Sequence, residues 1–298
     1  MRCLVTGGLG FIGTHLVKRL RELGHNVTVL DNCSNPSNPL DVRDPYYERL
    51  GAENAGDIKW LASWPSDPTF EWVFHLAAVS RTPQAIANPL HCHAVNATGS
   101  LLLLDFVRRT CPEARVVLAS SNIVYGSPNP YRASKLAMEE YMSAYNELYG
   151  LNCIALRYSN VYGPGMRWDD PICLASMRRS MVEKGYIELT GDGTQSRAFT
   201  HVSEIVKATL AAAQGDYIGV CDVSSGFRRS IKQMAEMMIA GYGSGEIRYG
   251  APRLGDTREI SQDPSDHGFG QQGNRWAQTT PEDGIRGVLA EIPSEVRA

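Results

Sequence analysis

The sequence predicts an α/β protein built on a doubly wound parallel sheet, and two patterns support this prediction. From the N-terminus to about residue 160, short apolar runs alternate with stretches of helical periodicity, as in parallel strands joined by crossover helices. The first run, Cys3-Leu4-Val5, leads directly into Gly7, Gly8 and Gly10, and a helical pattern begins at Phe11. A strand, a glycine turn and a helix N-terminus therefore open the chain.

The glycine turn suits a bound dinucleotide. Gly7 allows a tight turn, Gly10 lets the backbone approach a pyrophosphate, and Gly13 lets the helix lie close to the strand. The free N–H groups at Phe11 and Ile12 and the positive end of the helix dipole would then face the phosphates. The spacing is G-x-x-G-x-x-G rather than G-x-G-x-x-G, and any tight strand-to-helix turn favours glycine. The motif therefore needs a second sign.

An acidic residue after the second apolar run supplies that sign. Val27-Thr28-Val29-Leu30 ends in Asp31, about twenty residues past the glycines, where a carboxylate would accept from the 2′-hydroxyl of an adenosine ribose. Asn32 follows Asp31, and no adjacent arginine or lysine would balance a 2′-phosphate. The sequence therefore predicts NAD rather than NADP as the cofactor.

The other elements continue the alternation. A segment rich in proline and asparagine follows Asp31, where no strand is expected, and a weak strand then ends at Asp57-Ile58. Strong strands are predicted at 72–76, 115–119 and 153–156. Further helices are predicted at 90–110, 131–149, 172–184, 203–213 and 230–241, and the segment 160–164 is predicted to be a loop.

These elements predict two domains. Residues 1–165 are expected to form the NAD-binding domain, to which segments at about 192–225 return, and residues 166–298 mainly form a smaller lobe. Open α/β sheets bind ligands at the C-terminal edge of their strands. The smaller lobe is therefore expected to cover that edge and to bind the substrate.

Composition limits the classes of function. The 298 residues are 43% hydrophobic and 20% charged, as in ordinary globular proteins, and the net charge of −3 gives no electrostatic reason to expect nucleic acid or an anionic membrane as a partner. No apolar run approaches a membrane span, the N-terminus opens into a strand, and the seven cysteines contain no C-x-x-C pair. A reduced, cytoplasmic protein is expected. His91 and His93 fall on opposite sides of the expected helix, so no metal site is predicted.

Catalytic chemistry is predicted at Tyr131 and Lys135, which stand four residues apart and share a helix face. A free tyrosine, with a pKa near ~10, is a poor base at neutral pH. A nearby ammonium and a positive nicotinamide ring would both lower that pKa, and Ser121, at the end of a strand, would hold a substrate hydroxyl. The alternative for Y-x-x-x-K alone is an exposed helix pair. The serines before it and the dinucleotide turn upstream favour the catalytic interpretation.

The ordered motifs resemble the extended short-chain dehydrogenase/reductase family, in particular its NAD-dependent nucleotide-sugar epimerases and dehydratases. The matching stretches cover nearly the whole chain and include TGGLGFIG (6–13), LDN (30–32), DI (57–58), FHLAA (74–78), NATGS (96–100), SSNIVYG (120–126), YRASK (131–135), LRYSNVYGPG (156–165), GDGTQSRAFTHV (191–202) and RLGD (253–256). The resemblance implies a Rossmann-like doubly wound sheet and a homodimer formed through the helices near 91–110 and 131–149.

The resemblance also implies roles for individual residues. Ser121, Tyr131 and Lys135 would be the catalytic set. Besides Tyr131 and Lys135, the implied cofactor contacts are Gly7, Gly10, Phe11, Ile12, Gly13, Asp31, Asn32, Asp57, Ile58, Leu76, Ala77, Ala78, Ser80, Asn96, Ser120 and Tyr158. The implied contacts to a nucleotide-diphosphate sugar are Ser121, Asn122, Asn160, Arg197, Arg253 and Asp256. Guanidinium forks suit a diphosphate, although Arg253 and Asp256 have a surface ion pair as their alternative.

Within this family the residues after Ser121 separate the reactions. Dehydratases carry an Asp-Glu pair there and decarboxylases a glutamate just before V-Y-G, whereas this chain has Asn122 and Ile123. The resemblance therefore implies a 4-epimerase of the UDP-glucose/UDP-galactose type, which DNCSN (31–35) also resembles. A 4-ketosugar reductase or dehydrogenase and a non-catalytic dinucleotide-binding protein stay open as alternatives. The link 127–130 is shorter than is usual in the family, and Ala198 stands where an aspartate is usual.

Overall fold

The computed structural model describes residues 1–34, 57–64, 69–168, 170, 173–251 and 279–292. The chain forms two compact units. The first comprises Met1–Val124, Pro128–Tyr158 and Val206–Asp222, and the second comprises Tyr125–Ser127, Ser159–Ile205 and Val223–Ala298.

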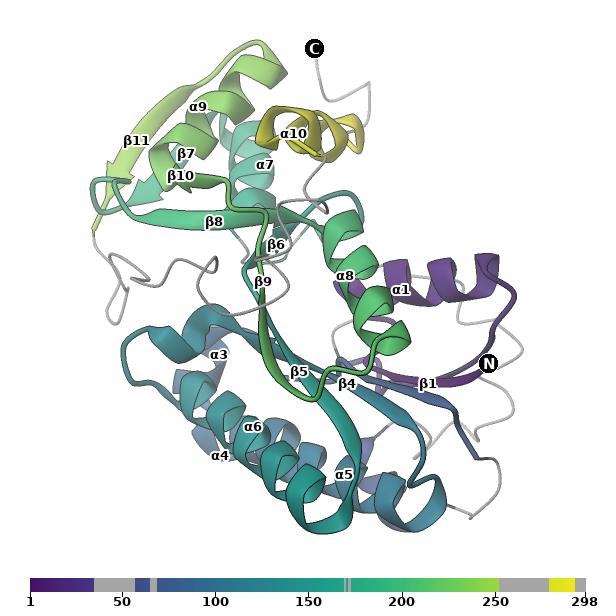
Figure 1. Cartoon of the computed structure of the whole chain (residues 1–298). Coiled ribbons are helices and arrows are strands. Elements are labelled where there is room, and N and C mark those ends of the chain that lie inside the picture. Colours follow the sequence, from purple (N-terminus) through teal and green to yellow (C-terminus); the bar gives the residue numbers. More distant parts are fainter. Residues whose placement is uncertain (35–56, 65–68, 169, 171–172, 252–278, 293–298) are drawn as a thin grey trace. The chain divides into compact units, whose positions relative to one another are not determined.

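The first unit contains a six-stranded sheet in the order β2-β1-β3-β4-β5-β9 (Figure 1). The strands are β1 (Arg2–Thr6), β2 (Asn26–Leu30), β3 (Trp72–His75), β4 (Arg115–Ser121), β5 (Asn152–Tyr158) and β9 (Gly219–Val223). The strands β1 to β5 pair in parallel, and the strand order reverses direction between β1 and β3. The predicted doubly wound parallel sheet is confirmed.

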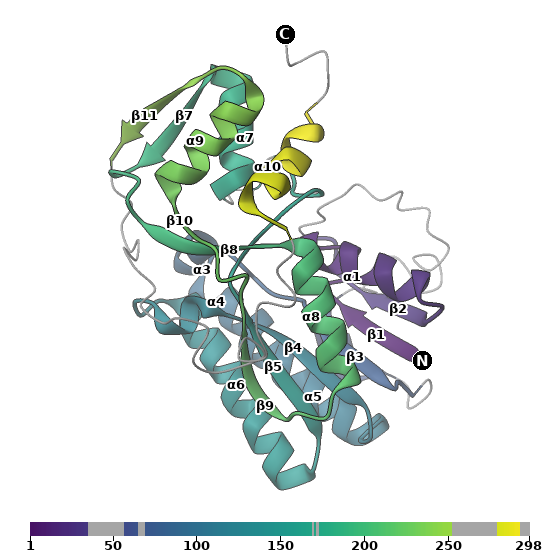
Figure 2. The ribbon, with the colours of Figure 1, turned by 45° about the horizontal axis from the view of Figure 1, so that its top comes forward.

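Helices cover both faces of this sheet. They are α1 (Phe11–Glu22), α3 (Thr82–Ala87), α4 (Pro89–His93), α5 (Gly99–Thr110), α6 (Pro130–Tyr149) and α8 (Val202–Gln214). Figures 1 and 2 show α4, α5 and α6 on one face and α1 and α8 on the other. Among the described residues, no helix has the length and apolar character needed to cross a membrane.

The predicted helix at 90–110 forms with an irregular turn in its middle. A π turn, η2 (Ala94–Thr98), joins α4 to α5 without a break. After the π turn, Leu103, Leu104, Phe106 and Val107 of α5 are buried in a core shared with the strands. Burying each large apolar side chain stabilises the fold by about 1.5–3 kcal/mol. This core packs α5 against Val73 of β3 and Val116 and Leu118 of β4.

The predicted helix at 131–149 corresponds to α6, and its ends have local causes. Asn129 precedes Pro130, and the Asn129 side chain accepts a hydrogen bond from the Arg132 N–H, 2.9 Å away. Asparagine before proline is a favourable start for a helix because it satisfies a free N–H at the first turn. Gly150 ends the helix with a left-handed φ of +68°, as glycine commonly does.

Two local expectations are wrong. Ile58 belongs to a 3-10 helix, η1 (Ile58–Ala62), because the Asp57 carboxylate accepts the Lys59 N–H at 2.9 Å and caps that turn; the rest of the expected weak strand lies outside the described residues. Most of the proline-rich segment after Asp31 is also outside them. The expected loop at 160–164 begins with a short strand, β6 (Asn160–Tyr162), which pairs in parallel with β8 (Ser196–His201).

The second unit contains two small sheets, one in the order β10-β8-β6 and one that pairs β11 with β7. Its other strands are β7 (Tyr186–Thr190), β10 (Arg228–Ser230) and β11 (Glu246–Gly250). Its helices include α7 (Cys173–Lys184), α9 (Ile231–Tyr242) and α10 (Pro281–Ala290). The helices α7, α8 and α9 coincide with predicted helices. That this unit binds the substrate stays a prediction.

Candidate active site

The glycine turn after β1 is closed by contacts that leave no room for side chains. A Cβ on Gly7, whose φ is +69°, would lie 2.5 Å from the Ala77 backbone nitrogen. A Cβ on Gly13 would lie 2.2 Å from the Gly7 carbonyl oxygen. Gly10 precedes α1 and has no side chain that could cap the helix, and the first turn of α1 carries no acidic residue. The positive end of this helix is therefore suited to an anion such as a pyrophosphate.

Asp31 lies beside the glycine turn. Its carboxylate accepts hydrogen bonds from the Leu9 N–H, at 2.9 Å, and from the Cys33 N–H, at 2.8 Å. Burial raises the pKa of Asp31, and these two N–H groups lower it in part. Each carboxylate oxygen has more than one acceptor position, so both can still receive a ribose hydroxyl. The glycine turn and this carboxylate together fit the phosphate and ribose parts of NAD.

A buried hydrogen-bonded chain connects the end of β1 with the π turn. The Ser100 hydroxyl donates to the Asn96 carbonyl at 2.5 Å, so it accepts from Nε2 of His75 at 2.9 Å. Nδ1 of a neutral His75 then accepts from the Thr6 hydroxyl at 2.7 Å, and Thr6 accepts from the Ala77 N–H at 3.3 Å. Burial, followed by the charge of Lys135, lowers the pKa of His75 to about 3. His75 is therefore a neutral part of this chain.

Asn96 holds the segment that follows β3. Its side-chain oxygen accepts the Val79 N–H at 2.8 Å, and its amide nitrogen donates to the Val79 carbonyl at 3.0 Å and to the Ser134 hydroxyl at 2.9 Å. Asn96 is fully buried. Its side chain therefore positions the residues around Val79, two of which, Ala78 and Ser80, are predicted cofactor contacts.

The predicted catalytic residues lie together in the first unit. Ser121 is the last residue of β4, and its hydroxyl hydrogen-bonds to the phenol of Tyr131, near the start of α6. Nζ of Lys135 lies 6.0 Å from the centre of the Tyr131 ring and donates to the Ala119 carbonyl at 2.7 Å. Tyr131 is 9% exposed and Lys135 4%. The alternative of an exposed helix pair is therefore wrong.

The pKa values of these residues are governed by burial. Burial raises the pKa of Tyr131, although the Ser121 hydrogen bond and the charge of Arg81 lower it in part. Burial lowers the pKa of Lys135 to about 8, against the opposite effects of Cys92 and Glu139. The sequence predicts that the pKa of Tyr131 is lowered. The side chains around Tyr131 do not produce that lowering by themselves, because they bury the phenol away from water.

The other predicted cofactor residues take structural partners. The Ser120 hydroxyl donates to Glu139 at 2.5 Å, and the Tyr158 hydroxyl lies 2.7 Å from that of Thr209. The Leu76 N–H donates to the Thr6 carbonyl at 3.0 Å. The Asn32 side chain accepts the Ser34 N–H at 3.1 Å. These contacts leave their roles toward a cofactor as predictions.

The predicted substrate contacts are divided between the units. Asn122 begins a 3-10 turn, η3 (Asn122–Tyr125), directly after Ser121. Asn160 and Arg197 belong to the second unit, on the neighbouring strands β6 and β8, where Nδ2 of Asn160 lies 3.4 Å from the Ala198 carbonyl oxygen. Arg253 and Asp256 lie outside the described residues.

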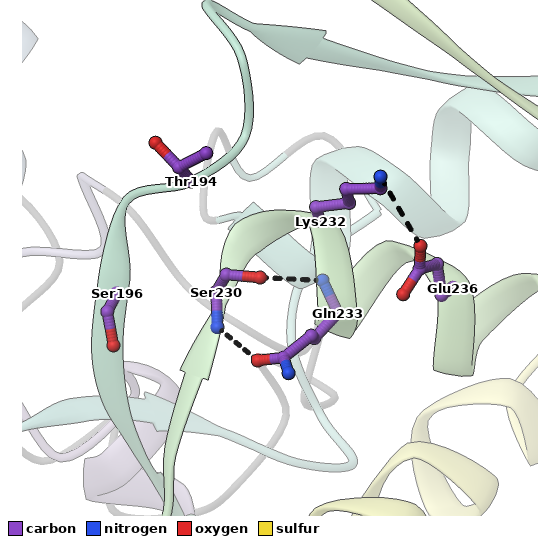
Figure 3. Close-up of a pocket in the computed structure, with 6 residues that line it drawn as sticks. All are labelled: Thr194, Ser196, Ser230, Lys232, Gln233 and Glu236. Carbon is purple, nitrogen blue, oxygen red and sulfur yellow. Dashed lines mark hydrogen bonds and ion pairs between the residues drawn. The ribbon is translucent and has the colours of Figure 1, made fainter.

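A hollow in the second unit is separate from these predictions. Figure 3 shows the residues that line it: Thr194, Ser196, Ser230, Lys232, Gln233 and Glu236. Ser230 and Gln233 cap the start of α9 reciprocally, at 3.0 and 2.8 Å, and Lys232 pairs with Glu236 at 3.9 Å. Ser196 precedes Arg197 on β8, and neighbouring strand residues point to opposite faces. The hollow therefore contains no predicted site residue.

Sequence reasoning missed the buried polar residues behind the catalytic set. Glu139, 5% exposed, and His75 are both buried and fully hydrogen-bonded at this end of the sheet. Glu139 stands four residues after Lys135, so the helix-face argument that joined Tyr131 to Lys135 could have found it. His75 belongs to the FHLAA motif, but its partners are 25 and 69 residues away in the sequence.

The chain is similar to known proteins over most of its length. Residues 3–219 match the model of the NAD dependent epimerase/dehydratase family. A putative UDP-glucose 4-epimerase of Methanocaldococcus jannaschii is 31% identical over 289 residues, which cover 87% of this chain and 89% of that protein. UDP-glucose 4-epimerase of Thermotoga maritima, solved with UDP-glucose, has a TM-score of 0.84 at 27% identity, covering 97% of this chain and 98% of that one.

A further solved structure bears on the cofactor. UDP-glucose 4-epimerase of Thermus thermophilus, in complex with NAD, has a TM-score of 0.82 at 26% identity, covering 97% of this chain and 98% of that one. Other similar proteins have different activities in their names, among them a UDP-glucuronic acid decarboxylase and a dTDP-glucose 4,6-dehydratase. The similar proteins therefore share a family but catalyse different reactions.

Proposed function

Because the chain belongs to the NAD-dependent epimerase/dehydratase family, we propose that it is a nucleotide-sugar 4-epimerase acting on substrates of the UDP-glucose/UDP-galactose type. The observation that carries this proposal is the hydrogen bond between Ser121 and the buried Tyr131, with the buried Lys135 beside them and no acid or base at the two positions after Ser121. Such a site can move a proton at one sugar hydroxyl, and the two side chains that follow Ser121 supply no second group for a further elimination.

The cofactor of this family is NAD. Its pyrophosphate would be held by the glycine turn at the start of α1, and its adenosine ribose by Asp31. When bound, NAD would supply the hydride acceptor for oxidation at C4 of the sugar, and the reduced cofactor the hydride donor for the reverse step. The rest of the reaction is carried by the side chains of the chain.

Tyr131 would take the proton of the sugar 4-hydroxyl during oxidation and return it after reduction. Ser121, already hydrogen-bonded to the Tyr131 phenol, would hold the same hydroxyl oxygen while the proton moves. The groups of the chain leave Tyr131 protonated, with Ser121 and Arg81 favouring its phenolate. Positive charge added beside the phenol would lower its pKa further and let it act as a base. The 4-keto sugar would then rotate within the site, so that hydride returns to the opposite face of C4.

The residues after Ser121 support epimerisation over dehydration. A 4,6-dehydratase must also remove the C5 proton and protonate the leaving 6-hydroxyl. Asn122 has an amide with no proton to lose near neutrality, and Ile123 has no polar atom. The Ile123 side chain packs against the small apolar cluster of Ala85, Cys92 and Tyr131. The space next to the catalytic phenol is therefore lined by an apolar group where a dehydratase needs an acid or base.

The test is to incubate the wild-type protein with UDP-, dTDP-, GDP- and CDP-sugars and to analyse the products by mass spectrometry and NMR. The expected product has the mass of the substrate and the opposite configuration at C4, with no net change in NADH absorbance. A loss of water or of carbon dioxide would instead indicate a dehydratase or a decarboxylase. A net absorbance change would indicate a reductase or dehydrogenase, and no product from any sugar would favour a binding protein.

We also propose that the protein is a homodimer formed through α5 and α6. Large apolar side chains of α6 are exposed, namely Tyr141, Leu148 and Tyr149, and Arg108 of α5 lies over the Tyr149 ring at 5.1 Å. Exposed apolar side chains of this kind on one helix suit a partner surface. Light scattering should give twice the mass of the chain, and Leu148→Glu should give the monomer mass.

A further inference from the structure

Three residues at intervals of four form one stripe of α6, and each contacts the end of β4. Nζ of Lys135 donates to the carbonyl of Ala119 at 2.7 Å. The carboxylate of Glu139 accepts from the hydroxyl of Ser120 at 2.5 Å. The phenol of Tyr131 hydrogen-bonds to the hydroxyl of Ser121. Three successive residues of the strand are thus held by three turns of one helix.

Glu139 supplies the buried carboxylate of this stripe. The residue is 5% exposed, and Arg157 of β5 donates to both of its carboxylate oxygens, from Nε at 2.9 Å and from Nη2 at 2.6 Å. Ser120 and Arg157 are direct partners across the β4–β5 ladder. Glu139 therefore joins α6 to two strands at the place where the strand end that carries Ser121 leaves the sheet.

An ion pair between the buried Glu139 and the part-buried Arg157 is poor evidence for a stabilising role, because desolvating such charges can cost as much as their attraction returns. An apolar pair of similar volume would hold the helix on the sheet equally well. What an apolar pair cannot do is hold a strand hydroxyl in one position or place a negative charge one helical turn from Lys135. The position of this pair behind the catalytic residues therefore points to their function.

We propose that Glu139 is a positioning residue of the active site, which fixes the strand end carrying Ser121 against Tyr131 and Lys135 and keeps the Lys135 side chain in its ammonium form. This inference rests on the proposed function, since it takes Tyr131 and Lys135 as the acting pair. Glu139 itself touches neither the tyrosine nor the reacting atoms; it acts through Ser120, Arg157 and Lys135.

The charged and titratable groups around Lys135 come from four elements. Tyr131 and Glu139 lie on its own helix, Cys92 on α4 and His75 on β3, and Arg157 of β5 pairs with Glu139. Burial lowers the pKa of Lys135 to about 8, and Cys92 and Glu139 oppose that effect. His75 has a pKa lowered by burial and stays neutral. Removing the charge of Glu139 should therefore let Lys135 lose its proton at a lower pH.

Two variants separate the charge of Glu139 from its contacts. Glu139→Gln removes the charge but keeps an oxygen that can accept from Ser120 and from Nε of Arg157. Glu139→Asp keeps the charge but shortens the side chain by one methylene, so one carboxylate cannot reach both partners. Glu291→Gln is the matched control, because Glu291 pairs with the buried Arg178 at 2.7 Å within the second unit.

The experiment follows the Lys135 side chain by NMR across pH in the NAD-bound protein, with Lys135→Met to assign its resonance. In Glu139→Gln, Lys135 should titrate about one pH unit lower than in the wild type, and the alkaline limb of kcat should move with it. In Glu139→Asp, the titration should stay near that of the wild type, while kcat falls about tenfold or more with little change in KM. Glu291→Gln should move neither reading.

An unshifted Lys135 titration in Glu139→Gln overturns the inference, and so does full kcat in Glu139→Asp. The NMR titration needs no sugar substrate. A shifted Lys135 in a protein that turns over no nucleotide sugar would therefore support the role of Glu139 while the proposed function fails. Epimerase activity with an unshifted Lys135 titration in Glu139→Gln would support the proposed function while the role of Glu139 fails.

Discussion

The glycine turn after β1 and the end of β4 are built in opposite ways. At the glycine turn, other backbone atoms lie so close to Gly7 and Gly13 that neither position has room for a Cβ. At the end of β4, long side chains of α6 hold successive strand residues through buried hydrogen bonds. The first site depends on missing side chains and the second on charged ones. The first is therefore tested by adding a methyl group, and the second by removing a polar atom.

Buried hydrogen bonds connect the two sites. Thr6, directly before Gly7, bonds to His75, which bonds to Ser100, and Ser100 bonds to the backbone of Asn96. The Asn96 side chain then reaches Ser134, beside Lys135 on α6. Every link is between buried groups, so it is shielded from competition with water. This chain of hydrogen bonds thus supports both the glycine turn, here called the backbone-built site, and the end of β4 with α6, here called the side-chain-built site.

The largest effect is expected at the side-chain-built site. Tyr131→Phe removes one hydroxyl that hydrogen-bonds to Ser121, so turnover should fall by about 10²–10⁴-fold, the scale of a lost general base. The free energy of unfolding should change by only about 1 kcal/mol, the net value of one hydrogen bond. Steady-state kinetics and thermal unfolding measure the two effects separately.

The matched control for this variant is Tyr162→Phe. Tyr162 is also a buried tyrosine, and its hydroxyl contacts the Thr280 carbonyl at 3.5 Å within the second unit. Turnover by Tyr162→Phe should remain near that of the wild type. Nearly full activity in Tyr131→Phe would show that the mechanism proposed for Tyr131 is wrong.

The next effect tests the connecting chain through pH. His75 has a pKa of about 3 in the folded protein and an ordinary value of 6.5 when unfolded. Between these two pH values the unfolded state binds a proton that the folded state does not. The contribution of the neutral His75 to the free energy of unfolding is therefore fully present above pH 6.5 and is lost as the pH falls toward 3. The loss should be on the order of 3 kcal/mol by about pH 4.

His75→Gln should flatten this dependence, because a glutamine amide can donate to Ser100 and accept from Thr6 but does not titrate. Denaturant unfolding across the same pH range measures the slope, and the exposed His91 changed to glutamine is the matched control. An unchanged slope in His75→Gln would mean that other groups carry the acid sensitivity.

The contrast between the two sites also explains what the sequence predicted. The glycine turn and Asp31 were predictable because close backbone approach demands glycine at fixed spacings. The shared face of Tyr131 and Lys135 followed from helix periodicity. The link between Thr6 and His75 spans 69 residues and follows no local rule. The raised pKa of Tyr131 escaped prediction because the spacing of residues shows which charges are near but not how deeply they are buried.

Two short elements differ from the sequence prediction for a similar reason. Asp57 was expected at the end of a strand, yet its carboxylate caps a 3-10 turn, a contact that spans only two residues. The segment 160–164 is predicted to be a loop, yet its first three residues form β6 and pair with β8. The partner of Asn160 is Phe199, 39 residues further along the chain. Short elements take their structure from one contact, local or distant, rather than from periodicity.

A smaller effect is expected from adding a methyl group at the backbone-built site. In Gly13→Ala, the new Cβ would meet the Gly7 carbonyl oxygen at 2.2 Å and the Gly8 Cα at 2.7 Å. Both are backbone atoms of the turn, so the turn must move, and unfolding should become easier by about 2 kcal/mol, with weaker NAD binding. Calorimetry of unfolding and NAD titration measure these effects.

Gly287→Ala is the matched control, because Gly287 is also a helical glycine. Its new Cβ would meet only Pro164 Cγ and Cδ, at 3.4 and 3.7 Å, which are ordinary contacts. Alanine is the better helix former by about 0.5–1 kcal/mol, so this variant should be slightly more stable than the wild type. Equal changes in the two variants would show that the turn does not restrict residue 13.

The smallest effect concerns the carboxylate beside the backbone-built site. Asp31 already accepts from two backbone N–H groups, so the ribose contact adds to a carboxylate that is fixed in place. Asp31→Asn keeps only one accepting oxygen and removes the charge that would repel a 2′-phosphate. NAD affinity should fall by about tenfold, in line with a lost hydrogen bond to a charged group, while the preference over NADP narrows. Calorimetric titration of both dinucleotides measures this, with Glu22→Gln, which removes an exposed carboxylate of α1, as the control. Equal affinity of the wild type for NAD and NADP would show that Asp31 does not select the cofactor, and that the glycine turn binds the dinucleotide without help from this carboxylate.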